Sequence, residues 1–323
     1  MSTDSGPGPA SGRDRSAGGV ASRALVVGEA LVDVVRRLDG TTTEHPGGSP
    51  ANVAIGLGRL GRPVDLLTWF ARDAHGGLVR AHLEESEVRV VPGSDEADRT
   101  PVALATLDAA GAASYTFDLD WQVPELALAS DVVVVHTGTI GAALEPGGAQ
   151  VRRLLAGAQA QATVTYDPNI RPALLGTAEE VRPLVEHLVR ISDVVKVSDE
   201  DLAWLEPGVD PLDVATRWAS AGPAVVVVTR GGAGVLAVTA AGERLDLPTP
   251  QVEVADTVGA GDSFMSGLVD GLWAADLLGA DRRAELRAID AATLGPVLER
   301  SASIAAITVS RLGANPPWTA ELD

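Results

Sequence analysis

The sequence predicts an α/β fold, in which a doubly wound, mostly parallel sheet is flanked by helices and carries a small β-sheet appendage. Two observations predict it. Four continuous apolar runs in the second half of the chain lack the alternation of half-exposed strands, which is typical of parallel strands buried on both faces. Two other strand-like runs are separated only by a turn, which indicates a hairpin outside the parallel sheet.

The first half of the chain supplies strands and helices in alternation. The run ALVVGEALVDVV at 24–35 predicts a strand, Pro50 to Leu60 a helix ended by Gly61, residues 62–70 a strand, and residues 73–87 a helix. The hairpin is predicted from PVALATLD at 101–108 and ASYTFDLD at 113–120, with its turn at Ala110 and Gly111.

The four apolar runs of the second half are the predicted core strands. They are DVVVVHTG (131–138), ATVTYDPN (162–169), DVVKVS (193–198) and AVVVVTRGG (224–232), with helical segments between them. QVEVA at 251–255 predicts a further strand, and apolar residues at helical spacing from Phe264 to Trp273 predict a helix that begins at Asp262. We expect one domain at 23–323, preceded by a disordered Gly/Ser/Pro/Ala-rich tail at 1–22.

Composition excludes several classes of protein. The net charge of −19 argues against nucleic acid or an anionic membrane as the main partner. The chain has no cysteine, so disulfides, thiolate catalysis and Cys-zinc sites are excluded. No apolar run approaches the ~18–20 residues of a transmembrane helix, and the N-terminal segment lacks the apolar region of a signal peptide, so we expect a cytoplasmic protein.

Two common nucleotide-binding motifs do not fit this chain. GLGRLG at 56–61 matches the dinucleotide pattern G-x-G-x-x-G, but it follows a helical segment instead of a strand. Gly61 is better explained as the helix C-cap, and Gly56 and Gly58 as sites of close helix packing. A Walker A loop needs a lysine after its glycines, and Lys196, the only lysine, lies in a predicted strand.

The stretch DTVGAGDSF at 256–264 is the strongest candidate for an anion site. It follows the predicted strand at 251–255 and predicts a Gly-Ala-Gly turn and then a helix that starts at Asp262. Backbone N–H groups from Val258 to Gly261, together with the helix dipole, suit a bound phosphoryl group. The alternative is that Asp262 is simply the N-cap of that helix.

A second stretch, HPGGSPANVAIGLGRLG at 45–61, leads from a Gly-Gly turn into a helix whose first turn carries Asn52. An amide at that position, beside exposed backbone, suits the binding of vicinal hydroxyls. The alternative is that Asn52 only satisfies local backbone groups.

Together these two stretches resemble the two signatures of the PfkB/ribokinase family of carbohydrate kinases, about 200 residues apart and in the right order. The resemblance covers roughly residues 23–320. Within the family the chain looks most like fructokinases, on GEALVDVV (28–35), GGSPANVA (47–54) and YDPNIRPAL (166–174). The lysine found in the first signature of ribokinases is missing, whereas kinases of 2-keto-3-deoxygluconate share the DPN-x-R stretch.

The resemblance implies a ribokinase-like fold and ATP-dependent phosphorylation of a sugar primary hydroxyl, with fructose giving fructose 6-phosphate. Asp262 would be the general base, and the amides of Gly259, Ala260 and Gly261 would form the anion hole. The implied sugar-binding residues are Asp33, Gly47, Gly48, Asn52 and Arg171. Segments at about 33–46 and 96–121 would form a β-sheet lid, which dimerises in many relatives.

The resemblance also implies the ATP and metal sites. The ATP side would comprise Ser198, Thr229, Gly231, Gly232, Gly234, Gly261 and Asn315. Asp201 would contact Mg²⁺ through water, although the family has a longer Glu there. Asp256 and Val258 match part of a K⁺ site, but a ligand of some relatives falls on Pro317 here.

The substrate stays open at this stage. A kinase of 2-keto-3-deoxygluconate, ribose or a nucleoside is an alternative of the same class, and a non-catalytic sugar- or nucleotide-binding regulator is an alternative of another class. The intact G-A-G-D sequence argues against a regulator. We expect the lid residues Tyr115, Phe117, Asp118 and Trp121 to border the sugar, and acidic residues at 118–120 would then repel a sugar acid.

Overall fold

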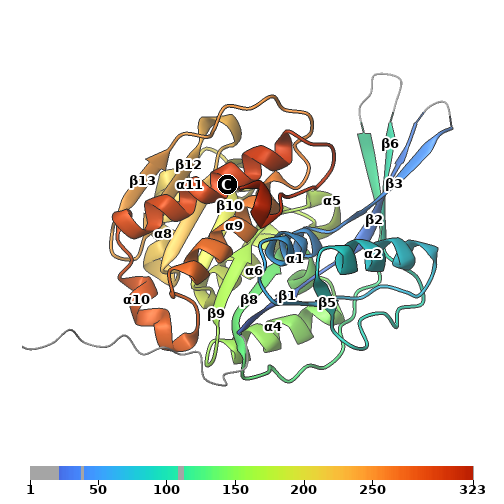
Figure 1. The fold of residues 1–323 in the computed structure, drawn as a ribbon, viewed down its shortest axis with the longest axis horizontal. Coiled ribbons are helices and arrows are strands. Elements are labelled where there is room, and N and C mark those ends of the chain that lie inside the picture. The colour runs from blue at the N-terminus through green and yellow to red at the C-terminus, as the bar shows by residue number, and fades with distance from the viewer. Residues whose placement is uncertain (1–21, 38–39, 108–112, 323) are drawn as a thin grey trace, which may run out of the picture.

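A computed structural model describes the chain over residues 22–37, 40–107 and 113–322. Within these residues, nine strands form one main sheet (Figure 1). Their order across the sheet is β13 (Arg244–Leu247), β12 (Val235–Thr239), β11 (Val225–Thr229), β10 (Val194–Ser198), β9 (Thr163–Asp167), β8 (Val132–Gly138), β1 (Arg23–Val27), β4 (Val64–Leu67) and β5 (Val88–Val90). Neighbours pair in parallel except at β11–β12 and β12–β13, which confirms the mostly parallel sheet.

Helices cover both faces of this sheet, so alternate residues of each central strand enter two different apolar clusters. One face packs against α1 (Ser49–Arg59), α2 (Ala74–Glu85), α9 (Ala260–Ala274), α10 (Arg283–Arg287) and α11 (Ala291–Val309). The other packs against α4 (Gly147–Ala158), α6 (Ala178–Ile191), α7 (Asp199–Leu205) and α8 (Pro211–Ala221). Burial on both faces explains why these strands are continuous apolar runs.

Helix boundaries follow local capping chemistry. Helix α1 has Pro50 in its first turn, and Gly61 after it adopts a left-handed φ of 77°, as predicted for its end. The Asp73 side chain caps α2 by accepting from the Gly76 amide. Helix α6 begins with a capping box between Thr177 and Glu180.

A second, four-stranded sheet projects from one end of the molecule (Figure 1). Its order is β3 (Thr42–Gly47), β2 (Leu31–Arg36), β6 (Val102–Leu107) and β7 (Ala113–Asp118). Strands β6 and β7 are the predicted hairpin, and β2 joins β6 in parallel. We call this the small sheet. The predicted turn at Ala110 and Gly111 and all but the last residue of the predicted tail lie outside the described residues.

Two strand predictions were wrong. The run at 24–35 is two strands in two different sheets, because the chain leaves the main sheet at Gly28 and enters the small sheet at Leu31. A Cβ on Gly28, whose φ is 156°, would lie 2.2 Å from Pro50 Cγ, so the chain turns in close contact with α1. The segment 251–255 is not a strand, and Val252 and Val254 are exposed.

The glycines of GLGRLG are packing residues, as the sequence predicts. A Cβ on Gly56 would lie 2.3 Å from Ser266 Oγ of α9, and a Cβ on Gly58 would lie 2.0 Å from the Ser86 carbonyl oxygen at the end of α2. Real atoms do not approach this closely, so any larger residue here separates the helices.

We therefore expect Gly58→Ala to lower the free energy of unfolding by ~1–3 kcal/mol, since the clash is with backbone that has little room to move. Gly157→Ala is the matched control, because Gly157 is in α4 and its Cβ would meet nothing within 4 Å. That control should be neutral or stabilising by up to ~1 kcal/mol. Urea unfolding of both variants measures the difference, and equal stability of the two would contradict the packing argument.

Candidate active site

A cavity of about 590 Å³ opens where the carboxyl ends of the central strands meet the small sheet. This is the edge at which doubly wound sheets bind ligands. The lining residues come from the carboxyl ends of five strands of the main sheet, from the start of α9 and from the small sheet. Examples are Glu29, Ile140, Asn169, Ser198, Thr229, Gly261, Asp33 and Phe117. The N-terminal and C-terminal sequence motifs therefore face the same space.

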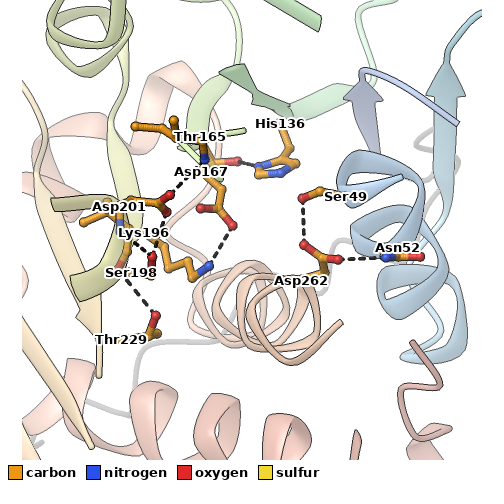
Figure 2. Close-up of polar contacts among 12 residues, drawn as sticks. Ser49, Asn52, His136, Thr165, Asp167, Lys196, Ser198, Asp201, Thr229 and Asp262 are labelled. Carbon is orange, nitrogen blue, oxygen red and sulfur yellow. Dashed lines mark hydrogen bonds and ion pairs between the residues drawn. The ribbon is translucent and has the colours of Figure 1, made fainter. Parts of the chain in front are cut away.

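Asp262 lies in the first turn of α9 and lines this cavity, and the residue is only 8% exposed. Its two carboxylate oxygens accept separate hydrogen bonds from α1: Ser49 Oγ donates at 2.7 Å and Asn52 Nδ2 at 2.8 Å (Figure 2). The N-cap position of α9 belongs to Gly259, so the alternative role of Asp262 as an N-cap is wrong. Its carboxylate is instead fixed by a neighbouring helix.

The Gly-Ala-Gly loop needs its glycines for space and conformation. Gly259 has a left-handed φ of 76°, and a Cβ there would lie 2.6 Å from Ala314 Cβ. The amides of Gly261 and Asp262 lie in the first helical turn, where N–H groups have no intrahelical acceptor. The Ala260 amide already donates to Thr257 O at a long 3.3 Å. The loop thus offers an anion the positive end of α9.

One wall of the cavity contains Ser198, Asp201, Thr229 and Gly231. Asp201 is held on both sides, since Ile170 N–H donates to its Oδ1 at 2.9 Å and Ser198 Oγ donates to its Oδ2 at 2.8 Å (Figure 2). Gly232 and Gly234 follow in the same loop, outside the set of lining residues. Each oxygen of Asp201 keeps a lone pair free for a water molecule.

Asp256 and Asn315 are not among the residues that line the cavity, and both form hydrogen bonds to neighbouring segments. The two carboxylate oxygens of Asp256 accept from the amides of Val258, at 3.0 Å, and Gly313, at 2.9 Å. The side-chain oxygen of Asn315 accepts from Arg59 of α1 at 2.5 Å. Asp256 thus ties the Gly-Ala-Gly loop to the C-terminal loop that contains Asn315.

Four of the five predicted sugar-binding residues also line the cavity: Asp33, Gly48, Asn52 and Arg171. Gly47, the fifth, packs on Asp33, since a Cβ there would lie 2.2 Å from Asp33 Oδ2. Gly48 needs to be glycine, because its φ is 106° and a Cβ would lie 2.4 Å from the Glu29 carbonyl oxygen. Burial raises the pKa of Asp33, while the charge of Arg171 opposes that shift.

Of the side chains expected to border the sugar from the small sheet, Phe117 lines the cavity. Asp118, the next residue of the strand, instead faces outward and pairs with Arg99 at 2.6 Å. Trp121 is buried in the core, where its indole N–H donates to Gly141 O. The side chain of Tyr115 lies outside the description. The predicted repulsion of a sugar acid by residues 118–120 therefore has no support from Asp118.

Glu29 is a cavity residue that the sequence analysis missed. Its side chain is 4% exposed, and its Oε2 has no hydrogen-bond partner among the described residues. Burial raises the pKa of Glu29 to about 7, with Asp262 adding to the shift and Arg171 opposing it. An acidic residue inside the apolar run 24–35 was the available signal.

Asp167 and Lys196 were also missed. They form a buried ion pair, with Lys196 Nζ donating to Asp167 Oδ2 at 2.8 Å (Figure 2). Lys196 lines the cavity beside the anion loop, because a Cβ on Gly261 would lie 2.7 Å from its Nζ. A single lysine inside an apolar strand was the signal, but the sequence analysis used it only to exclude a Walker A loop.

The described ranges hold neither an evident metal cluster nor a membrane-spanning helix. No group of three or more His, Cys, Asp or Glu side chains comes together there in a way that would hold a metal ion. Over the same ranges, the structure has no helix whose length and apolar character would let it cross a bilayer.

The sequence pattern of the pfkB family carbohydrate kinases matches residues 21–321. The chain is 32% identical over 256 residues to a fructokinase of Klebsiella pneumoniae, covering 76% of this chain and 83% of that one. It is 32% identical over 266 residues to a fructokinase of Rhizobium leguminosarum bv. trifolii, covering 79% and 81%. Its fold is similar to that of a fructokinase with bound ATP from Xylella fastidiosa, with a TM-score of 0.80, 24% identity and coverage of 94% and 98%.

A cavity with an anion loop at the edge of a ribokinase-like sheet is the arrangement of a phosphoryl-transfer enzyme that acts on small molecules. The chain belongs to the pfkB family of carbohydrate kinases, which confirms the resemblance drawn from the two motifs. It is an ATP-dependent sugar kinase.

The buried Glu29 should make stability depend on pH. Its pKa of about 7 in the folded protein exceeds the usual 4.5, so the folded state loses stability as the pH rises through that interval. Above it, the cost of the buried charge is at most about 3 kcal/mol. Glu29→Gln should therefore raise the thermal unfolding midpoint at pH 8 more than at pH 5.

Glu299→Gln is the control for this measurement, because Glu299 is exposed on α11 and should not change the pH dependence. A Glu29→Gln protein that is less stable than the wild type at pH 8 would mean that the ionised carboxylate stabilises the fold.

Proposed function

We propose that the protein transfers the γ-phosphoryl group of ATP to the primary hydroxyl of a neutral sugar, with fructose as the preferred substrate and fructose 6-phosphate as the product. The observation that carries this proposal is the placement of Asp262. A buried carboxylate, fixed by Ser49 and Asn52, lines the same cavity as Asp33, Arg171 and the Gly-Ala-Gly loop.

Asp262 would act as the general base. In this step the sugar oxygen forms a bond to the γ-phosphorus, the bond from that phosphorus to the β,γ-bridging oxygen breaks, and the hydroxyl proton moves to Asp262. The amides of Gly259, Ala260 and Gly261 would stabilise, by hydrogen bonds, the negative charge that develops on the transferred group. Phosphoryl transfer is catalysed mainly by positioning and electrostatics, which these groups supply.

The sugar would be held by Asp33, Gly47, Gly48, Asn52 and Arg171. The buried Oδ1 of Asn52 has no partner among the described residues, so it is available to a sugar hydroxyl while Nδ2 holds Asp262. Ser198, Thr229, Gly231, Gly232, Gly234, Gly261 and Asn315 are the proposed ATP-side residues. Asp33, Gly48, Asn52 and Arg171 of the first group and Ser198, Thr229, Gly231 and Gly261 of the second line the same cavity, which is compatible with a transfer between two substrates.

Mg²⁺ would enter with ATP, bound mostly by phosphate oxygens and water. Asp201 fits this role, since both of its oxygens are fixed and each keeps a lone pair toward water. When bound, Mg²⁺ neutralises charge on the phosphates. The carboxylate of Asp256 is already shared by two backbone amides, so K⁺ binding at Asp256 and Val258 stays a prediction from the sequence.

The small sheet would act as a lid over the sugar and as a dimer interface. Its position favours the first role, because Asp33, Ala103 and Phe117 reach the cavity from it. Its outer strands β3 and β7 are open edges within the described residues, and pairing with a second copy would satisfy one of them.

Kinases of 2-keto-3-deoxygluconate, ribose or nucleosides remain the alternatives within the family. Fructose is favoured because curated relatives at 32% identity are named fructokinases. It is also favoured because Glu29 and Asp33 line the cavity, where their carboxyl groups would repel a sugar acid. A non-catalytic regulator is disfavoured, since it would have no need for a base held by two donors.

Asp262→Asn should lower kcat by ~10³-fold or more while sugar affinity changes little, because the amide keeps the shape but cannot accept the proton. Asp270→Asn is the matched control on the same helix. Asp270 is buried and pairs with Arg62 and Arg300 away from the cavity, so this change should lower stability and leave kcat near the wild-type value. Steady-state kinetics measures both. If Asp262→Asn keeps a tenth of the wild-type kcat, Asp262 is not the base.

Fructose should exceed ribose and adenosine in kcat/KM. A closed site whose groups are arranged for one set of hydroxyls rejects analogues that leave those groups unpaired, by up to ~10⁴-fold. Kinetics with fructose, ribose, adenosine and 2-keto-3-deoxygluconate at fixed MgATP compares them directly. Preferred turnover of the sugar acid would overturn the fructose assignment and leave the kinase assignment intact.

A further inference from the structure

The charge balance of the cavity presents a problem for a nucleotide substrate. The described residues that line it include six acidic side chains, namely Glu29, Asp33, Asp199, Glu200, Asp201 and Asp262. The same set includes two basic residues, Arg171 and Lys196. A polyphosphate carries several negative charges, so it would be repelled unless a cation meets it inside the cavity.

Arg171 lines the cavity with Glu29 and Asp33, and its charge acts on both of these carboxyl groups. Lys196 is next to the Gly-Ala-Gly loop of residues 259–261. Its Nζ lies 2.7 Å from the position that a Cβ of Gly261 would occupy, so Gly261 is also the residue that leaves room for the ammonium group. Figure 2 shows Lys196 extending toward the start of α9 from the side opposite Ser49 and Asn52.

The environment of Lys196 keeps it charged. The side chain is 5% exposed, and burial by itself would lower its pKa, but the charge and hydrogen bond of Asp167 raise the pKa overall. Asp262 on α9 and Asp201 on α7 add to this effect. On β8, the neighbouring His136 is held neutral, since burial and Lys196 lower its pKa to about 3.

The ion pair is directed, because Asp167 contacts Lys196 through one oxygen only. Asp167 Oδ2 receives the Lys196 hydrogen bond, whereas Oδ1 is buried without a partner among the described residues. A lysine ammonium has three N–H donors, and one is used by Asp167. The remaining donors are next to the loop where charge develops during transfer.

We propose that Lys196 is a catalytic residue that contacts the transferred phosphoryl group, and that Asp167 is the positioning residue that orients it and keeps it protonated. The proposal rests on the proposed function of the site. Lys196 would hydrogen-bond phosphoryl oxygens from one side while the amides of the Gly-Ala-Gly loop do so from the other. The alternative is that the ion pair has no catalytic role and only joins β9 to β10.

Variants of the pair separate these roles. Lys196→Met leaves Asp167 buried without a counter-charge, so it should lower both stability and kcat. The double variant Asp167→Asn, Lys196→Met removes both charges and should regain most of the stability. Its kcat should stay ~10²-fold or more below wild type, the loss typical of one lost transition-state donor, with the sugar KM nearly unchanged. A double variant that regains both stability and kcat overturns the proposal.

Asp167→Asn alone tests the positioning role by a pH profile. Without its carboxylate, burial should lower the pKa of Lys196, so kcat should fall at alkaline pH, where the wild type is flat. A profile parallel to that of the wild type would remove Asp167 from this role. Arg283→Met is the matched control at the other end of β10. It breaks the pair with Asp193, at 2.6 Å, and should cost stability without changing kcat or the pH profile.

The kinetics should use whichever sugar the wild type phosphorylates best, and a calorimetric titration with MgATP should accompany them. The titration needs no sugar, so it tests Lys196 even if no candidate sugar is turned over, an outcome that would contradict only the proposed function. We expect the double variant to bind MgATP ~5-fold or more weakly, while Arg283→Met binds it as the wild type does. Unchanged MgATP affinity together with unchanged kcat would leave Lys196 a structural residue.

Discussion

The site depends on the close approach of α1 and α9. Gly56 permits it, because any side chain there would meet Ser266 of α9. At this separation Ser49 and Asn52, in the first turns of α1, reach the carboxylate of Asp262 across 210 or more positions of sequence. The two motifs on which the family resemblance rests are therefore one structural unit, and a glycine in the middle of a helix supports the geometry around Asp262.

The second constraint is electrostatic. Burial of Glu29 and Asp33 near Asp262 raises their pKa values, so holding either carboxylate ionised in the cavity costs folding stability. A phosphate group binds best to positive charge, and the described residues offer it at the positive end of α9 and at Lys196. The described lining thus combines six acidic side chains with Lys196, Arg171 and the positive end of α9.

The fold was predictable where one local pattern has one structural meaning. Apolar runs identified β8 to β11, and positive φ at Gly61 and Gly259 matches the glycine signals in the sequence. The run 24–35 failed because its apolar character is the same in two different sheets. Lys196 and Asp167 are 29 residues apart on adjacent strands, and only the pairing of β9 with β10 brings them together. Asp118 was misassigned because strand alternation directs Phe117 inward.

A crystal structure with the preferred sugar and a non-hydrolysable ATP analogue tests the account most directly, since it locates both substrates around Asp262. The account predicts the primary hydroxyl within ~3 Å of the Asp262 carboxylate and in line with the terminal phosphate, which is the reach of a general base. The terminal phosphate should lie against the Gly-Ala-Gly loop and Lys196. A complex with both ligands bound and the reacting hydroxyl directed away from Asp262 would contradict the account.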